Sequence, residues 1–306
     1  MSDDRVPGPV AHGGDAKAVA DALGLDVTEV LDLSASLNPF APDVVGLASK
    51  YLGALVAYPD DSAATAALAV AIDVHPDRLV LTNGGAEAIA LVAGLLETGS
   101  IVEPEFSLYR RHLESVDAGA GRWRSNPSNP LGMLADASEE AAVWDEAFYP
   151  LATGTWTRGD DAAWRLGSLT KLWACAGLRL GFVIAPDRDA AEAIRRRRPR
   201  WSVNGLALAL VPELLAQTHL PTWADQIADL RGTFADELRE HGITVEESAA
   251  NWVVLREVGD LRSALAPAGF LVRDCTNFGL PGTVRVALPD PTRLREVVSV
   301  IATHAP

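Results

Sequence analysis

Short apolar runs alternate with amphipathic or alanine-rich stretches along the first two thirds of the chain. The run Leu79–Thr82 leads through two glycines into an alanine-rich stretch, which indicates a strand, a turn and a helix in succession. Residues 15–24 also have apolar positions at helical spacing and end in a glycine, Gly24, which indicates a helix. Further runs of strand length are 101–104, 142–145 and 180–185. Strands that alternate with helices predict an α/β fold, with a mostly parallel sheet flanked by helices on both faces.

The last third of the chain has a different pattern. It predicts one long helical stretch over about 203–239, then three short strands and a closing helix, which together form a smaller α+β domain. The strands are expected near 242–245, 252–255 and 283–288, and the closing helix over 292–301. We therefore divide the chain into an N-terminal segment (1–40), a large domain (41–200) and a small C-terminal domain (201–306).

Composition and charge narrow the class of protein. The chain is 48% hydrophobic and 22% charged, as in ordinary globular proteins, and its net charge of −15 disfavours nucleic acid and anionic membranes as partners. The basic run 195–200 is interpreted as a solvated helix end rather than a phosphate or nucleic-acid patch. No secretory leader or membrane span is expected, and the two distant cysteines favour the cytoplasm.

Two features lie where predicted strands end, which is where open α/β sheets place their active sites. Gly84, Gly85 and Ala86 stand between a strand and a helix, so their backbone N–H groups can approach an anion. A glycine pair of this kind is also a common packing device. Asp145 ends another strand, where it either caps a helix or offers a carboxylate to a ligand.

The segment 168–181 has the strongest chemical signal. Lys171 lies in a mostly uncharged stretch, with the hydroxyls of Ser168 and Thr170 before it and Arg179 eight residues after it. Hydroxyls and a guanidinium are suitable donors for a phosphate. A lysine in a desolvated site has a lowered pKa and becomes a nucleophile that forms imines.

This segment resembles the Schiff-base lysine motif of class I/II aminotransferase-like enzymes, which use pyridoxal 5'-phosphate (PLP) and have fold type I. Other matching pieces follow in the same order along nearly the whole chain. They are His12-Gly13-Gly14, Ser34-Ala35-Ser36-Leu37-Asn38-Pro39, Tyr58-Pro59-Asp60, Asn83-Gly84-Gly85-Ala86-Glu87, Pro104-Glu105-Phe106-Ser107-Leu108-Tyr109-Arg110, Asn126-Pro127-Ser128-Asn129-Pro130, Asp145-Glu146-Ala147-Phe148, Trp201-Ser202-Val203-Asn204 and Arg285-Val286-Ala287. Within this family the chain most resembles the L-threonine-O-3-phosphate decarboxylases of cobalamin biosynthesis, which are related to histidinol-phosphate aminotransferases.

The resemblance implies roles around the cofactor ring. Lys171 would carry PLP as a Schiff base and move protons, and Asp145 would pair with the pyridine nitrogen, making the ring an electron sink. Asn129 would donate to the phenolic oxygen and Phe106 would stack on the ring face. Taken alone, Phe106 fits a plain core position equally well. The large domain would thus bind the cofactor.

The resemblance also implies groups for the cofactor phosphate and for a small phosphorylated amino-acid substrate. At the phosphate these are the Gly85 and Ala86 amides, Ser168, Thr170, Arg179 and, from the neighbouring subunit of a homodimer, Tyr58. Arg285 would bind the substrate α-carboxylate, Asn38 would contact the substrate, and His12 would be a structural or substrate-edge residue. The N-terminal segment would cover the substrate. By themselves, Tyr58 also fits a turn and Arg285 a surface strand, whereas Tyr109, Trp201 and Glu146 are interpreted as packing or structural residues.

The chain departs from the family pattern in three places. Phe148 stands where histidinol-phosphate aminotransferases usually have tyrosine, as in the decarboxylase-type sequences, and Ser36 stands where asparagine is usual. The chain is also short, so that 107–125 has room for one strand and one helix, and 132–143 for a helix of about two turns. The leading hypothesis is decarboxylation of L-threonine O-3-phosphate to aminopropanol phosphate. The alternatives are a histidinol-phosphate-type aminotransferase and a non-catalytic binding subunit with a PLP fold.

Overall fold

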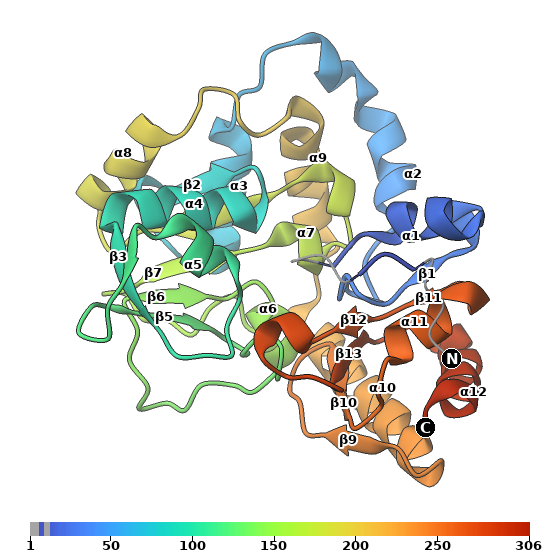
Figure 1. Cartoon of the computed structure of the whole chain (residues 1–306). Coiled ribbons are helices and arrows are strands. Elements are labelled where there is room, and N and C mark those ends of the chain that lie inside the picture. Colours follow the sequence, from blue (N-terminus) through green and yellow to red (C-terminus); the bar gives the residue numbers. More distant parts are fainter. Residues whose placement is uncertain (1–5, 9–12) are drawn as a thin grey trace.

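The large domain is built on a seven-stranded sheet (Figure 1). The computed structural model describes residues 6–8 and 13–306 of the chain. In spatial order the strands are β2 (Leu79–Thr82), β8 (Gly181–Ile184), β7 (Trp164–Gly167), β6 (Val143–Asp145), β5 (Arg122–Ser125), β3 (Thr98–Ile101) and β4 (Ser115–Val116). Strand β8 is antiparallel to both of its neighbours, and every other neighbouring pair is parallel. The predicted mostly parallel sheet is confirmed.

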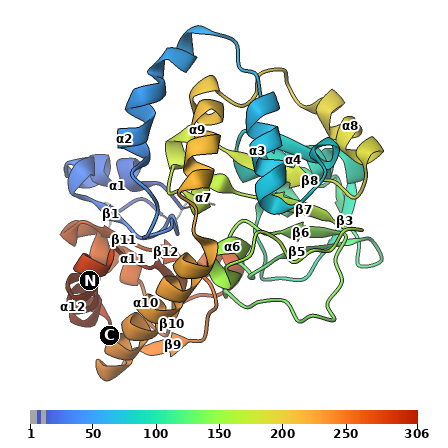
Figure 2. The same ribbon diagram turned by 180° about the vertical axis from the view of Figure 1, so that it is seen from behind.

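Helices cover both faces of this sheet because successive strand residues point to opposite sides. Leu79 and Leu81 of β2 belong to the core on one face, whereas Val80 belongs to the core on the other. Helices α4 (Gly84–Leu96), α5 (Leu108–His112) and α8 (Arg188–Arg197) cover the Val80 face, and α3 (Ser62–Ile72) and α9 (Gly205–Ala216) cover the opposite face (Figures 1 and 2).

The small domain has an antiparallel sheet packed against helices. In spatial order its strands are β12 (Arg273–Asp274), β13 (Val284–Ala287), β10 (Trp252–Arg256) and β9 (Thr244–Glu246), and its helices are α10 (Leu220–Glu240), α11 (Leu261–Leu265) and α12 (Leu294–His304). The domain limits remain a prediction, since α9 packs on α3 and on η2 (Ser49–Val56) of the large domain. In the described part of the chain, no helix combines the length and apolar character needed to cross a bilayer.

The N-terminal segment is joined to the small domain. Strand β1 (Leu31–Asp32) pairs in parallel with β11 (Phe270–Leu271), and the Ala287 N–H donates to the Leu33 carbonyl at 2.8 Å. The Asn251 side chain donates to two further carbonyls of this segment, those of Ser36 and Leu37. The remaining elements are α1 (Ala16–Leu23), α2 (Val44–Ala48), α6 (Tyr149–Thr153), α7 (Leu169–Leu172), η1 (Val27–Glu29), η3 (Pro76–Arg78), η4 (Ala176–Leu178), η5 (Ala266–Ala268), η6 (Thr276–Phe278) and η7 (Pro291–Arg293).

Three expectations about local structure are wrong. The stretch 203–239 forms two helices, α9 and α10, and Pro221 occupies the first turn of the second, where its missing N–H costs no hydrogen bond. Residues 107–125 were expected to form one strand and one helix, but they form a helix and two short strands. Residues 132–143 contain no helix, because the Arg158 guanidinium binds the carbonyls of 136, 137 and 139 and thereby fixes an irregular loop.

Two arginines of the basic run bind the chain itself. Arg195 Nη2 donates to three backbone carbonyls at the start of β2, including that of Leu79 at 3.1 Å. Arg198 donates to the Leu81 carbonyl and to the Asp61 carboxylate, the latter at 2.7 Å. These arginines therefore attach the end of α8 to β2, in addition to carrying charge at a helix end.

Candidate active site

Lys171 lies at the carboxyl end of the large sheet, on the short helix α7 that follows β7. Its Nζ donates to the Ala35 carbonyl at 2.6 Å and lies 5.8 Å from the centroid of the Phe148 ring. Burial lowers the pKa of the Lys171 amine to about 8, and the cationic Arg285 and Arg179 act in the same direction. A much larger fraction of this amine is therefore neutral near pH 7 than for an exposed lysine.

Asp145 ends β6, and its carboxylate is held by two hydrogen bonds. The Tyr109 hydroxyl donates to Oδ2 at 2.8 Å and the Ala147 N–H donates to Oδ1 at 3.1 Å. Burial raises the pKa of Asp145, and these bonds act against that rise. Tyr109, predicted from the sequence to be a packing residue, therefore has a polar contact as well. No local signal indicates this contact, because 36 positions separate Tyr109 from Asp145.

Arg285 is a buried residue of β13 rather than a surface strand residue. Its Nη1 donates to Asn129 Oδ1 at 2.6 Å and its Nη2 donates to the Ser34 carbonyl at 3.0 Å. The guanidinium carbon lies 4.9 Å from the centroid of the Trp252 ring. The Arg285 Nε is buried and has no hydrogen-bond partner among the described residues, and burial lowers the pKa of this side chain to about 10.

Asn129 uses its amide oxygen for Arg285, which leaves the amide nitrogen as its donor toward a ligand. The loop that carries it is fixed on both sides. The Asn129 N–H donates to Ser125 Oγ at 2.9 Å, and Trp252 Nε1 donates to the Pro130 carbonyl at 2.8 Å. Asn129 is thus brought together with Arg285, although 156 positions separate them.

A cradle for an anion forms where α4 begins. Gly84 has φ +75°, and a methyl group there would lie 2.6 Å from Arg179 Nη2, so the guanidinium lies against the first turn of this 13-residue helix. A methyl group on Gly181 would lie 2.7 Å from the Gly85 backbone nitrogen, so only glycine permits this approach. A Cβ on Gly85 would lie 3.8 Å from the Ser168 Cβ. Backbone N–H groups, a helix N-terminus and a guanidinium together suit a phosphate.

Two predicted ligand-binding residues are engaged by the chain itself. The Thr170 hydroxyl donates to the Leu180 carbonyl and accepts from the Leu180 N–H, both at 3.1 Å, so it braces the loop of Arg179. The Asn38 side chain donates to the Leu172 carbonyl at 2.9 Å and accepts from the Phe40 N–H at 3.0 Å. Asn38 therefore ties the N-terminal segment to the helix of Lys171.

The other predicted residues are placed as follows. Phe106 is half-buried and makes an edge-to-face contact with Tyr109, with ring centroids 5.9 Å apart. Tyr58 is exposed and packs against the exposed Trp201, with ring centroids 4.5 Å apart. Ala86 lies in the first turn of α4, beside Gly85. His12 lies outside the described residues.

Arg273 is a functional candidate that the sequence did not reveal. It lies on β12 directly opposite Arg285 of β13, so the two side chains share one face of the sheet. Arg273 is buried, donates to Asn277 Oδ1 at 3.0 Å, and lies with its guanidinium carbon 5.2 Å from the centroid of Phe278. Two buried cations on neighbouring strands suit a ligand with two anionic groups.

The described groups fit PLP by their chemistry. A lysine with a lowered pKa, a buried carboxylate, an amide donor and a phosphate cradle correspond to the aldehyde, pyridine nitrogen, phenolic oxygen and phosphate of this cofactor. Residues 123–301 match the family aminotransferase class I and II. The chain belongs to this family and is a PLP-dependent enzyme of fold type I.

Two curated relatives match most of the chain. The chain is 29% identical to the threonine-phosphate decarboxylase of Salmonella typhimurium, with 88% of each chain covered. It is also 29% identical to the histidinol-phosphate aminotransferase of Haloarcula marismortui, with 94% of each chain covered. The alignment with the decarboxylase spans 324 positions and so exceeds the 306 residues of this chain. The decarboxylase therefore has residues without a counterpart here.

Solved structures share the fold. A decarboxylase from Sulfurospirillum multivorans superposes with a TM-score of 0.81 at 17% identity, covering 97% of this chain and 94% of that chain. The histidinol-phosphate aminotransferase from Sinorhizobium meliloti in complex with pyridoxal-5'-phosphate has a TM-score of 0.78 at 17% identity, with 98% and 96% covered.

Proposed function

We propose that this enzyme decarboxylates L-threonine O-3-phosphate to aminopropanol phosphate, a step of cobalamin biosynthesis. The observation that carries the proposal is the pair of buried arginines, Arg285 and Arg273, which face the same side of the small-domain sheet. They suit a small substrate with a carboxylate at one end and a phosphate at the other. The curated decarboxylase relative supports this substrate class.

Phe148 favours decarboxylation over amino transfer. It lies beside Lys171 and packs edge-to-face on Trp252, with ring centroids 4.8 Å apart. It occupies the position at which the sequence resemblance leads one to expect a tyrosine in histidinol-phosphate aminotransferases. With phenylalanine there, this position has no hydroxyl for the phenolic oxygen of the cofactor, and Asn129 is the donor that we assign to it.

The residues of the site would divide the work as follows. Bound PLP supplies an electron sink for the electron pair that the α-carbon would otherwise retain. Asp145 would hold a proton at the pyridine nitrogen, and Arg285 would orient the α-carboxylate so that the bond to it is the one that breaks. After carbon dioxide has left the α-carbon, the protonated form of Lys171 would return a proton to the same atom.

The experiment that tests this function is a parallel assay of both reactions. Incubated with PLP and L-threonine O-3-phosphate, the purified protein is expected to release carbon dioxide and form aminopropanol phosphate, identified by mass. Histidinol phosphate with 2-oxoglutarate is the matched aminotransferase assay. Amino transfer to 2-oxoglutarate without release of carbon dioxide would instead establish the alternative, which the aminotransferase relative supports.

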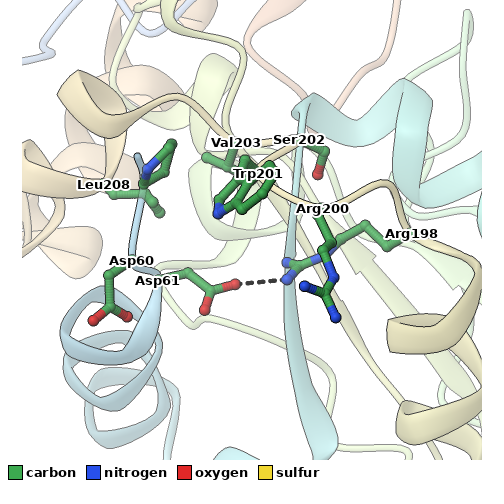
Figure 3. A pocket seen from close by; sticks show the side chains of 9 residues that line it. Asp60, Asp61, Arg198, Arg200, Trp201, Ser202, Val203 and Leu208 are labelled. Atoms are coloured by element: carbon green, nitrogen blue, oxygen red, sulfur yellow. Dashed lines mark hydrogen bonds and ion pairs between the residues drawn. The ribbon is translucent and has the colours of Figure 1, made fainter. Parts of the chain in front are cut away.

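We further propose that the protein is a cytoplasmic homodimer in which Tyr58 reaches the cofactor phosphate of the neighbouring subunit. Support comes from an exposed apolar surface, the Tyr58 patch, formed by Leu52, Leu55, Val56, Tyr58 and Trp201. Val56 is 91% exposed and Tyr58 is 79% exposed, which is unusual for side chains of this kind within one patch. A hollow of about 250 Å³ adjoins it, lined by Trp201, Asp60 and Arg200 among others (Figure 3). The cytoplasmic part of the proposal is supported by the two buried free cysteines, because the cytoplasm is a reducing compartment that keeps thiols unpaired.

The dimer has its own test. Val56→Asp is expected to raise the dimer dissociation constant by roughly a hundredfold or more, because an unpaired charge would be buried at the interface. Analytical ultracentrifugation measures this change. Val70→Asp is the matched control, since Val70 is 83% exposed on α3 and is not part of the patch. A wild-type protein that sediments as a monomer at micromolar concentration contradicts the proposal.

A further inference from the structure

Glu105 is buried directly before Phe106, and none of the roles assigned above uses its side chain. Only 4% of the residue is exposed. Its Oε1 accepts from the Ser125 N–H at 3.0 Å, and its Oε2 accepts from the Ser125 hydroxyl at 2.5 Å and from the Phe106 N–H at 3.3 Å. One carboxylate therefore joins the backbone at Phe106 to the last residue of β5.

The Ser125 hydroxyl extends this contact to Asn129. A serine hydroxyl has a single proton, and here Glu105 accepts it, so the same oxygen is left to accept from the Asn129 N–H at 2.9 Å. Asn129 in turn accepts from Arg285 at 2.6 Å. A continuous run of hydrogen bonds thus leads from Glu105 through Ser125 and Asn129 to Arg285.

The cation beside Glu105 offsets the burial of this carboxylate only in part. Arg124 forms a long ion pair with it, with Nη1 3.8 Å from Oε1, and the same nitrogen donates a hydrogen bond to the Ser125 carbonyl at 2.6 Å. Arg124 also faces a second carboxylate, that of Glu139, at 3.4 Å. Burial raises the pKa of Glu105 to about 7. Burying a carboxylate to anchor a loop has a large desolvation cost in free energy. An ionised carboxylate differs from a neutral side chain in that it only accepts hydrogen bonds, and all three groups that contact Glu105 are donors.

We propose that Glu105 is a positioning residue that fixes two cofactor contacts relative to each other. It holds the backbone of Phe106, whose ring would cover the face of the cofactor ring. Through Ser125 it also holds Asn129, whose amide would donate to the phenolic oxygen. This inference rests on the proposed PLP site. Glu105 itself does not touch the cofactor.

The test compares Glu105→Gln and Ser125→Ala with wild-type protein, each stripped of cofactor and titrated with PLP. Glu105→Gln keeps the size of the side chain, but one of its two oxygens becomes an NH₂ group. It therefore cannot accept all three hydrogen bonds, those from the Ser125 N–H, the Ser125 hydroxyl and the Phe106 N–H. We expect the PLP dissociation constant to rise about tenfold. We also expect the pH at which the visible band of the bound cofactor titrates to rise by roughly one unit, since a weaker Asn129 donor stabilises the phenolate less.

A double-mutant cycle separates this role from simple stabilisation. If Glu105 acts through Ser125, the double variant binds PLP no more weakly than Glu105→Gln alone, because each change breaks the same run of hydrogen bonds. Glu139→Gln is the matched control: it removes another carboxylate that faces Arg124, and it leaves Ser125 untouched. This control is expected to keep the wild-type PLP affinity and spectral titration.

Each outcome decides the matter. Glu105→Gln with wild-type affinity and titration overturns the inference, and if this variant does not fold, the same two measurements on Ser125→Ala take its place. If the wild-type protein shows a Lys171-dependent visible band, and the PLP affinity and spectral titration of Glu105→Gln are unchanged, this inference alone is overturned. A wild-type protein that forms no such band overturns the proposed PLP site and this inference together.

Discussion

Replacing Lys171 with alanine is expected to abolish the visible absorption of bound PLP and to lower turnover by about four orders of magnitude. The reason is that, in the proposed function, the side-chain amine both holds the cofactor covalently and returns the proton to the α-carbon. Absorption spectroscopy, and mass analysis after borohydride reduction, measure the covalent attachment. The chain has only two other lysines, Lys17 and Lys50, and both are exposed and paired with carboxylates.

These two lysines provide the controls for Lys171. Lys17→Ala and Lys50→Ala are expected to retain the band, and a reduced adduct at either position in the wild-type protein would contradict the assignment. Wild-type apoprotein is expected to take up PLP at a rate that rises with pH through about 8. Only the neutral amine attacks the aldehyde, and the pKa of Lys171 is lowered from its ordinary value to about 8. A rate that rises only above pH 10 would show that the amine is not desolvated.

Replacing Asp145 with asparagine is expected to lower turnover by roughly a thousandfold, equivalent to about 4 kcal/mol of barrier. A neutral amide keeps the size of the side chain but cannot stabilise a proton on the pyridine nitrogen, so the ring becomes a weaker electron sink. Steady-state kinetics measure the loss, and covalent attachment at Lys171 is expected to persist, because the cradle at α4 and the amine are unchanged.

Tyr109→Phe is the graded companion to this variant. It removes the 2.8 Å hydrogen bond to Asp145 Oδ2 and leaves the carboxylate in place, so we expect a loss of about tenfold, consistent with one hydrogen bond to a charged group. A Tyr109→Phe loss as large as that of Asp145→Asn would mean that the two act as a single unit. An Asp145→Asn variant with wild-type turnover would exclude Asp145 from the reaction.

Much of the large domain could be predicted from local sequence. The run Leu79–Thr82 forms β2 with the predicted limits, and the glycines that follow begin α4, because an apolar run followed by glycines and alanines has few other local solutions. The loop 132–143 was missed because its conformation depends on Arg158, whose guanidinium reaches it from a different part of the chain. The two-residue strand β4 was missed because a pattern this short carries no periodicity.

The hydrogen-bond partners of the side chains in the site were harder to predict from the sequence than the residues themselves. Thr170 and Asn38 were predicted from their type and order, but tertiary contacts decide that their polar atoms bind Leu180 and Leu172. The opposite case is Arg273, an ordinary arginine in sequence that becomes a neighbour of Arg285 only when β12 and β13 pair. Glu105 is similar, since nothing local indicates that its carboxylate meets Ser125.

The sequence by itself determined the fold class and the family, and it predicts Lys171 as the residue that carries the cofactor. These depend on local periodicity and on residue types in a fixed order, both of which are present along the chain. The tertiary structure alone decided the lowered pKa of Lys171, the Tyr109 bond to Asp145, and the pairing of Arg285 with Asn129 and Arg273. Burial, and contacts between residues far apart in sequence, exist only after the chain has closed on itself.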